Sequence, residues 1–517
     1  MLTIVLTNII IITYILLLLG VSHLTTSRSN NVSSNNSFFR GERQSPWYMV
    51  AFGMVGASIS GVTFVSVPGM VLHSDMTYLQ TCMGFILGYF VVAFVLLPIY
   101  YKMNLTSIYT VLRGISDEAY KTGAAIFIFS KLIGTAAKFF VPCYIISMAM
   151  GTNYYLTTIV LFVLIWLYTR KGGIKTLVWT DTVQTLCMLV ALLLIIYNVY
   201  GAVFSSQFLD EPSVGLRPSD YTIHNSQFSN ALSAIGASSY SRIFEFDDWG
   251  SPHNFFKCFI SGIFIVIVMT GLDQDMMQKN LTCKSLRDAQ KDMCTYGFAF
   301  LPVNALFLVL GIMLTMLYAK QGMALPEKPD ALLSGYVFGG GELLVAVFLI
   351  GIMSTSFSTI DSSLTALTTS FCVDIMDKEQ DEGLRRRVHF LMAVMLIICT
   401  MAFGMFNTTS LIDTIYRLVS YTYGPLLGLF AYSLYPSLSK GRGGTPPPGG
   451  VRGYCRLIPL ICLASPLICF ALDTYVPQFT GYHFGYELLL INGTITYLLL
   501  VVMSLTSITP LTPKKKQ

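Results

Sequence analysis

Long apolar runs alternate with short polar segments along most of the chain. Because a bilayer core about 30 Å thick takes about 20 apolar residues to cross as a helix, each run of that length predicts a membrane-spanning helix. The pattern therefore predicts an all-α polytopic membrane protein with about 13 transmembrane helices. The runs lie at about 2–22, 47–71, 76–101, 122–150, 154–169, 177–203, 255–278, 293–318, 342–373, 388–406, 410–435, 457–473 and 485–505.

The composition of the 517 residues agrees with this interpretation. Only 11% are Asp, Glu, Lys or Arg, against about 25% in ordinary soluble proteins, and 54% are hydrophobic. Such a chain cannot cover a soluble domain with polar surface, which excludes a soluble enzyme, a nucleic-acid-binding protein and a disordered scaffold. None of the 11 cysteines falls in a predicted exterior loop, so we expect no disulfide.

The basic residues predict the orientation of the spans, since Lys and Arg concentrate in cytoplasmic loops. Of the 32 basic residues, 24 fall in alternate connections, starting with the one after the first span. This places the amino terminus outside and the carboxyl terminus inside the plasma (cytoplasmic) membrane. We interpret residues 2–22 as a span rather than a cleaved signal peptide, because no basic residue precedes them and no small-x-small cleavage pattern is found.

Two spans contain clusters of glycine, proline and polar residues where a membrane helix is expected to continue. The second span carries such a cluster at residues 56–63, followed by Pro68 and Gly69, and the seventh carries another at residues 270–275. Irregular backbone in a membrane is tolerated where it lines a cavity. Two interrupted helices five spans apart are typical of an inverted-repeat transporter with a binding site at the bilayer midplane. The alternative is that these small residues only permit close helix packing.

The ninth span holds seven hydroxyl side chains and Asp361 within residues 354–363. Polar groups in the membrane are costly unless they bind something. At helical spacing four of the hydroxyls share a face, and hydroxyl and carbonyl oxygens suit a hard cation such as Na⁺. The alternative is that each hydroxyl bonds back to its own helix. The four hydroxyls belong to Thr355, Ser358, Thr359 and Ser362.

Three further charged residues lie in or at the ends of spans. Asp181 begins the sixth span, where it either contributes to a site or pairs with Lys175. Lys131 and Lys138 lie in the fourth span and need partners or a route to the interface. A structural ion pair of either lysine with Asp361 is one alternative.

Five segments, between about residues 38 and 375, together carry a family resemblance. They are residues 39–43 (FRGER), 60–69 (SGVTFVSVPG), 172–184 (GGIK, then WTD and Gln184), 273–279 (DQDMMQK) and 358–364 (STIDSSL). In order and spacing they resemble the sodium:solute symporter family, whose members carry sugars, proline, iodide, vitamins, monocarboxylates and sialic acid on a LeuT-type fold.

The resemblance implies a LeuT-type 5+5 inverted repeat with one extra helix before it and two after. The ten-helix core would span residues 47–435, with repeat one at 47–203, an exterior loop at 204–254 and repeat two at 255–435. A leading helix (1–22) and an interior loop (23–46) would precede the core. An interior linker (436–456), two trailing helices (457–505) and an interior tail (506–517) would follow it.

The resemblance also implies which cations bind and which residues bind them. One Na⁺ would be bound by the carbonyls of Gly56, Ile59 and Thr355 and the hydroxyls of Ser358 and Thr359. Some members bind a second Na⁺, and the equivalent residues here are Asp181, Ser358, Asp361 and Ser362, where Asp361 replaces a hydroxyl residue. We therefore expect one Na⁺ and allow for two.

For the solute, the first core helix is nearest to the sialic acid branch. There Ser58, Ser60 and Thr63 would touch the substrate, with Tyr78 as an aromatic neighbour. The arginine that binds the substrate carboxylate in that branch falls on Thr135, and a glutamine contact falls on Cys82. Lys131 and Lys138, about one turn away, are candidate replacements.

The expected function is Na⁺-coupled symport of a small organic solute (sialic acid, a sugar, a monocarboxylate or a related compound) into the cell by alternating access. The alternatives are an H⁺-coupled symporter and a membrane sensor on a transporter scaffold. We expect no enzyme, because no His-Asp, metal-ligand or Ser-Lys arrangement recurs among the spans. The expected partners are the solute, Na⁺ and the lipid bilayer, with no nucleic acid and no obligatory protein partner.

Overall fold

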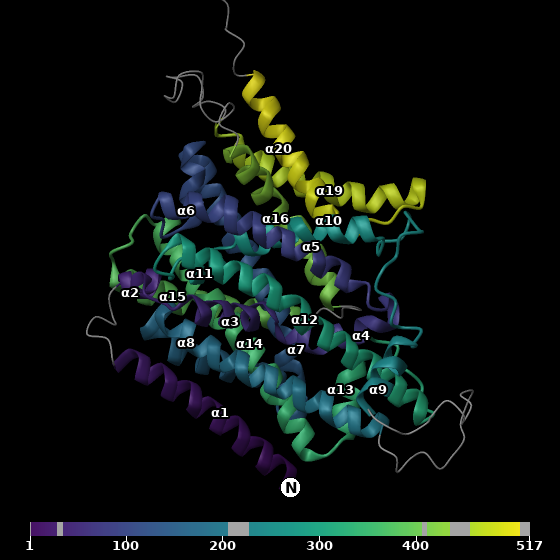
Figure 1. Cartoon of the computed structure of the whole chain (residues 1–517). Coiled ribbons are helices and arrows are strands. Elements are labelled where there is room, and N and C mark those ends of the chain that lie inside the picture. The colour runs from purple at the N-terminus through teal and green to yellow at the C-terminus, as the bar shows by residue number, and fades with distance from the viewer. Residues whose placement is uncertain (1, 28–34, 205–226, 406–410, 435–454, 507–517) are drawn as a thin grey trace, which may run out of the picture.

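A computed structural model gives the fold of the chain (Figure 1). It describes residues 2–27, 35–204, 227–405, 411–434 and 455–506. The expected interior linker and interior tail therefore lie almost wholly outside the described residues, as do parts of the loops at 23–46 and 204–254. The described residues form an all-helical fold, as the sequence predicts.

The helices correspond to the apolar runs, with short helices in some connections. Three π-helical turns extend or interrupt long helices: η2 (Val92–Leu96), η6 (Ile267–Gly271) and η7 (Phe371–Ile375). The α-helices are α1 (Leu2–Ser27), α2 (Asn35–Arg40), α3 (Trp47–Ser58), α4 (Gly61–Ser74), α5 (Tyr78–Val91), α6 (Leu97–Lys102), α7 (Asp117–Met150), α8 (Tyr154–Phe204), α9 (Gln227–Gly236), α10 (Phe255–Val266), α11 (Gln274–Asn280), α12 (Leu286–Lys320), α13 (Ala331–Gly339), α14 (Glu342–Ser370), α15 (Glu382–Phe403), α16 (Leu411–Leu434), α19 (Ile458–Thr480) and α20 (Leu488–Thr506).

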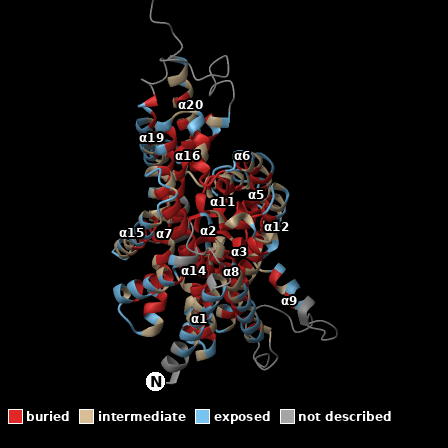
Figure 2. Ribbon diagram, turned by 90° about the vertical axis from the view of Figure 1, so that its left-hand side faces the viewer, coloured by how far each residue is buried: buried red, intermediate tan, exposed pale blue. Residues whose placement is uncertain are grey.

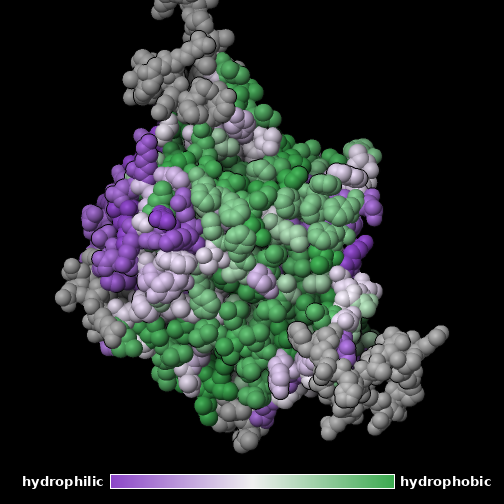
Figure 3. Space-filling model, viewed as in Figure 1, coloured by the Kyte–Doolittle hydropathy of each residue, from purple (hydrophilic) through white to green (hydrophobic). Residues whose placement is uncertain are grey.

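Many of these helices have the length and composition of membrane spans. Among the described residues 8 helices pass that test, or up to 10 if each of two bent pairs is one span. Shorter apolar helices lie at Ile9–Thr25 and Tyr154–Arg170. Apolar side chains cover most of the face seen in Figure 3, and hydrophilic side chains gather at its two opposite edges. The chain is a multi-pass membrane protein.

The fifth and sixth predicted spans are both present as helices, Tyr154–Arg170 and Gly173–Phe204, which meet without a loop at a kink inside α8. Gly173 marks the kink, with φ 52° and ψ −146°. A Cβ at this position would lie 2.6 Å from the Cα of Phe38. Positive φ and close backbone approach both favour glycine here.

Helix α14 lies at the centre of the helix bundle. Every residue from Gly351 to Ser370 is buried, and Figure 2 shows buried residues concentrated around α3, α8 and α14. The leading helix α1 lies along one edge of the molecule and α19 and α20 along the opposite edge (Figure 1). The hydroxyl-rich block predicted to bind a cation is therefore enclosed by other helices and does not face lipid.

Both predicted helix breaks are confirmed. Helices α3 and α4 meet at Ile59 and Ser60 with a bend of 63°, and the pair formed by α10 with η6 and α11 bends by 70°. Each second half begins with a capped turn, since the side chain of Ser60 accepts from Thr63 N and that of Asp273 accepts from Asp275 N. Such caps supply partners for amide groups that the break leaves free.

The carbonyl groups freed at the second break also have partners. Tyr100 donates its hydroxyl to Gly271 O at 2.8 Å, and Tyr109 donates to Leu272 O at 2.9 Å. An unsatisfied carbonyl inside a membrane costs several kcal/mol. These two tyrosines therefore help to make the break stable.

Gly311 in α12 tests how tightly the bundle is packed. A Cβ on Gly311 would lie 2.0 Å from Pro68 O, whereas one on Gly201 in α8 would meet nothing within 4 Å. We expect Gly311→Ala to lower the free energy of unfolding by about 1–3 kcal/mol and Gly201→Ala to leave it unchanged or slightly raised, because alanine favours helix. Thermal unfolding of both variants in detergent checks this. Equal stability of the two would contradict the packing described.

Candidate ion and solute site

The break between α3 and α4 lies against the hydroxyl block of α14. Thr359 Oγ1 is 3.5 Å from Ala57 O, in the last turn of α3. On the other side, α3 packs closely on α8, because a Cβ at Gly56 would lie 2.0 Å from Thr185 Oγ1. Glycine at this position thus allows the end of α3 to sit between α8 and α14.

The proposed ligands of the first Na⁺ meet in this region. Ile59 is the residue of the break itself and is fully buried. Thr359 Oγ1 donates to Thr355 O at 2.9 Å, so two of the predicted ligand oxygens are neighbours. Ser358 Oγ, one turn away, donates to Asp181 Oδ1 at 2.6 Å. The role of these residues as sodium ligands stays a prediction.

The alternative interpretation of the hydroxyl block, that its hydroxyls bond back to their own helix, holds for some of its residues. Thr355 and Ser356 do bond back to carbonyls of their own helix, at 2.9 Å and 2.5 Å from Ile352 O. Ser358 and Ser363 instead donate to carboxylates on other helices, Ser363 reaching Asp275 Oδ2 at 3.1 Å. The block therefore makes tertiary contacts that a merely self-bonded helix would not have.

The donor set fits Na⁺ better than a transition metal. Within the described ranges, no three His, Cys, Asp or Glu side chains cluster so as to hold a metal ion. Hydroxyl and carbonyl oxygens, with one carboxylate nearby, are the ligands of hard cations.

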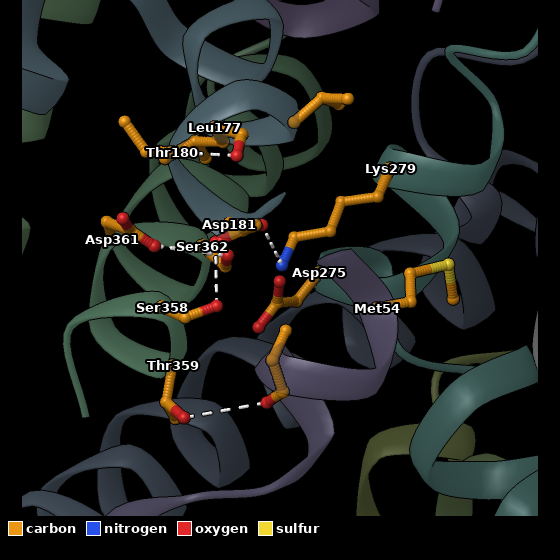
Figure 4. Close-up of polar contacts among 12 residues, drawn as sticks. Met54, Leu177, Thr180, Asp181, Asp275, Lys279, Ser358, Thr359, Asp361 and Ser362 are labelled. Carbon is orange, nitrogen blue, oxygen red and sulfur yellow. Dashed lines mark hydrogen bonds and ion pairs between the residues drawn. The ribbon is translucent and has the colours of Figure 1, made fainter. Parts of the chain in front are cut away.

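Lys279 changes the interpretation of the second cation site. Its Nζ lies 2.7 Å from Asp181 Oδ2, and the two side chains are 2% and 1% exposed (Figure 4). The alternative partner predicted for Asp181 was wrong, because Lys175 pairs with Glu42 at 3.0 Å. Asp181 thus already has a cationic partner inside the protein.

Asp361 lies close by but has different partners. Tyr168 donates to its Oδ2 at 2.8 Å, and Ser362 donates to its Oδ1 at 3.2 Å. The alternative ion pair of Asp361 with Lys131 or Lys138 is not formed among the described residues. The four residues predicted for the second site therefore form two bonded pairs, Asp181 with Ser358 and Asp361 with Ser362.

Lys131 is held at the second break instead. Its Nζ lies 2.9 Å from Asp273 Oδ2 and 2.8 Å from Asp275 Oδ2. Tyr423 on α16 also donates to Asp273 Oδ2, at 3.1 Å. This group of charges joins α7, the broken helix and α16.

A cavity of about 110 Å³ lies between the two breaks, and a smaller one of about 60 Å³ adjoins it. Ser58, Lys138 and Met269 line both of them. Cavities of this size have room for several water molecules or a small solute.

Seven of the eight predicted solute-binding residues line these cavities. Cys82 is the exception: it is 1% exposed and lines neither. In α5 its side chain is buried, so the position that the resemblance equates with a glutamine contact does not line either cavity. The seven are Ser58, Ser60, Thr63, Tyr78, Lys131, Thr135 and Lys138. Their contact with solute stays a prediction.

The sequence did not assign roles to several residues of the site. Asp273 and Asp275 lie in the predicted second break, and Lys279 follows them by one turn. Their charge in an apolar run was the available signal, since ionisable residues in membrane segments mark functional sites. No comparable signal marked Tyr296 and Tyr423, because tyrosine is common in spans. Tyr296 forms a hydrogen bond with Ser58.

Two broken helices, a polar cavity between them and an oxygen-rich block beside one break define a membrane transporter of the broken-helix class. Comparison with known proteins gives the family. The model of the sodium:solute symporter family matches residues 38–444, and the chain belongs to this family.

Curated relatives are Na⁺-coupled transporters. The chain is 23% identical over 421 residues to the sodium/sialic acid symporter NanT of Aliivibrio fischeri, covering 78% of each protein. It is 21% identical over 431 residues to the sodium-coupled monocarboxylate transporter 2 of Mus musculus, covering 80% of this chain and 66% of that one. A sodium-dependent multivitamin transporter of Oryctolagus cuniculus is 22% identical, and only 61% of its length is covered.

A solved structure supports the fold. A Na⁺-coupled sialic acid symporter in a substrate-bound, outward-open state superposes with a TM-score of 0.76, covering 97% of this chain and 98% of that chain at 16% sequence identity. The LeuT-type fold expected from the sequence is therefore confirmed at the level of overall architecture.

Proposed function

We propose that the protein is a secondary active transporter that couples Na⁺ to the import of a small organic solute by alternating access. The observation that carries the proposal is the position of Ser358 and Thr359, beside the α3–α4 break and next to the cavity. The Na⁺-coupled relatives support it, including those named for sialic acid and monocarboxylates.

The proposed topology has thirteen spans, with the amino terminus outside and the carboxyl terminus inside. The ten-helix core, residues 47–435, comprises two repeats of five, each opened by a broken helix. The alternation of basic connections supports the orientation, and the position of the two breaks supports the repeat.

Coupling in this proposal comes from ion binding at the first break. Na⁺ bound between the end of α3 and α14 holds the two together and favours the state that accepts solute from outside. At 100 mV each net positive charge moved inward gains about 2.3 kcal/mol, so one ion carried with an uncharged solute sustains a solute gradient of roughly fiftyfold.

Uptake into proteoliposomes tests the proposal. The purified chain is reconstituted, and a panel of labelled solutes is offered with a Na⁺ gradient, with a K⁺ gradient of the same size and with an H⁺ gradient alone. We expect uptake of one solute class to need the Na⁺ gradient. Uptake driven by the H⁺ gradient alone would favour the H⁺-coupled alternative, and no uptake of any solute would favour a sensor.

Thr63 gives a specific test of solute recognition. It lines the smaller cavity, and its Oγ1 is 3.2 Å from Ser60 Oγ. Thr63→Val keeps the shape and removes the hydroxyl, and loss of one hydrogen bond costs about 1 kcal/mol. We therefore expect the KM for solute to rise about fivefold while Na⁺ binding in the absence of solute persists. Thr494→Val, whose hydroxyl bonds its own helix in α20, is the control; equal loss of solute and Na⁺ binding would indicate a structural role.

A further inference from the structure

Four exposed basic residues lie together on the side of the membrane proposed to be interior. Lys102 ends α6, Lys284 lies in the turn before α12, and Arg287 and Lys291 lie in the first turns of α12. Among the described residues no salt bridge involves any of the four. Even when the half-buried Asp288 is counted, they keep an excess of positive charge. We call these four residues the interior basic patch.

Hydrogen bonds bring the segments of the patch together. Tyr101, the neighbour of Lys102, donates its hydroxyl to Asn280 O and Cys283 O, both at 3.2 Å, which holds the end of α6 against the turn before α12. The amide of Ser45, just before α3, donates to Thr282 O in the same turn at 3.1 Å. Three segments far apart in the sequence thus form one surface. It lies at the edge of the molecule that carries α6 and α11, where hydrophilic side chains gather (Figures 1 and 3).

Aromatic rings at the patch show its depth in the membrane. Lys291 Nζ lies 5.8 Å from the centroid of the Trp47 ring, and Arg43 Cζ lies 5.9 Å from that of Tyr101. Tyr48, whose ring packs on Trp47 with centroids 6.1 Å apart, is 60% exposed. Tryptophan and tyrosine with basic neighbours are typical of the interface between hydrocarbon and water. The patch therefore lies at the level of the lipid headgroups.

An exposed aromatic surface continues from the patch toward the membrane centre. Phe298 follows Lys291 by two helical turns on the same face of α12, about 10 Å further along the helix. It is 57% exposed, and Phe94 in η2 is 59% exposed. The ring of Phe90 lies between them, with its centroid 5.7 Å from that of Phe298 and 6.3 Å from that of Phe94. Cations at headgroup depth and apolar rings below them match the two parts of a phospholipid, whereas a free phosphate would use the cations alone.

The position of the patch relates it to both broken helices. Trp47 is the first residue of α3, and Lys284 follows the end of α11 by four residues. These are the ends of the two broken helices on the interior side. A ligand that spans the patch and Trp47 would contact both of them.

We propose that the interior basic patch binds the headgroup of an anionic phospholipid of the inner leaflet, whose acyl chains pack on Phe94 and Phe298. Clusters of Lys and Arg at a membrane surface attract anionic lipids, and both side chains donate to phosphate oxygens. A zwitterionic headgroup carries a cation of its own, which the patch repels. The inference goes beyond the proposed function, because lipid binding here does not depend on what the protein transports.

Lipid binding to the purified full-length chain in a neutral detergent tests this inference. The probes are dioleoylphosphatidylglycerol, dioleoylphosphatidylcholine and soluble glycerol phosphate, and binding is followed by the rise of the thermal midpoint with probe concentration. We expect phosphatidylglycerol to reach half its effect at a concentration at least tenfold lower than phosphatidylcholine, and this preference to weaken at high salt. Equal effects of the two lipids would overturn the inference. Binding of glycerol phosphate as tight as that of phosphatidylglycerol would show a phosphate site and overturn the lipid assignment.

Two variants with the same change of net charge locate the site. The patch variant replaces all four cations of the patch by glutamine, and the control variant replaces four exposed cations elsewhere on the interior side. We expect the patch variant to lose the preference for phosphatidylglycerol and the control variant to keep it. The control residues are Lys121, Lys378, Arg387 and Arg456.

The comparison of the two variants decides between a site and a general attraction. An equal loss of the preference in both would show that anionic lipid responds only to net charge, and would overturn the site. Should the patch variant fail to fold, the double variant Arg287→Gln with Lys291→Gln takes its place, with at least a threefold weaker preference expected and an unchanged preference overturning the inference. No gradient is applied, so a protein that does not couple Na⁺ to transport would give the same result.

Discussion

Replacing Ser358 and Thr359 together by alanine is expected to raise the Na⁺ concentration for half-maximal uptake at least tenfold. The double variant removes two of the five oxygens proposed to bind the ion. A tenfold change corresponds to about 1.4 kcal/mol, which is modest for the loss of two ligands. Uptake of labelled solute at a series of Na⁺ concentrations measures the shift, with protein abundance checked by blot.

Two other hydroxyls of α14 provide a matched control. Ser356 and Thr365 donate to carbonyls of their own helix, Ile352 O at 2.5 Å and Asp361 O at 3.0 Å. The double variant Ser356→Ala with Thr365→Ala removes equal numbers of oxygens and should keep the wild-type Na⁺ dependence. Wild-type Na⁺ dependence in the Ser358/Thr359 variant would show that the ligand assignment is wrong.

Lys279→Met is expected to have the largest effect on stability. It leaves Asp181 buried without its ammonium partner, and breaking a buried ion pair from one side costs about 3–5 kcal/mol. The methionine also leaves room beside Asp181 for a free cation. We therefore expect a marked fall of the thermal midpoint in choline buffer, partly recovered as Na⁺ is raised.

The double variant Lys279→Met with Asp181→Asn separates charge from packing. Removing both charges should restore much of the stability lost in the single variant and abolish its recovery by Na⁺, because no unpaired carboxylate remains. If Lys279→Met is as stable as the wild type, the ion pair between Lys279 and Asp181 does not contribute to stability. If Na⁺ raises the thermal midpoint of the double variant as much as that of Lys279→Met, the ion binds at a position other than Asp181.

The sequence predicted the all-helical membrane fold and both helix breaks because these depend on local properties. An apolar run long enough to cross a bilayer is visible in the chain itself. The breaks at Ile59 and Leu272 follow from glycine and polar residues inside such runs. The kink at Gly173 was not predicted as such, because a glycine beside a short polar stretch is equally compatible with a loop.

The partners of the charged residues could not be predicted in the same way. The sequence suggested Lys175 as the partner of Asp181, but whether Asp181 meets Lys175 or Lys279 depends on how α8 and α11 are rotated and packed. The same holds for Lys131, which turns toward Asp273 rather than Asp361. Sequence distance carries no information on these contacts, since they join different helices.

The lining of the cavities was predicted more fully than the ion pairs. Ser58, Ser60 and Thr63 belong to the break itself, so any cavity formed there exposes them. Cys82 was inferred from the resemblance alone, and the rotation of α5 leaves it buried outside the lining of both cavities.

The π-helical turn η2 can absorb a change in the number of residues in its span. A π turn holds one residue more than an α turn, so deleting one residue from Val92–Leu96 would convert it to an α turn and leave the residues that follow facing as they do now. A deletion in the α-helical turns on either side would instead rotate one part of the span against the other by about 100° about the helix axis, and Tyr100 would then point away from Gly271 O, the carbonyl that it satisfies at the second break. The segment Tyr78–Lys102 should thus accept a single-residue deletion within η2 but not in its regular turns.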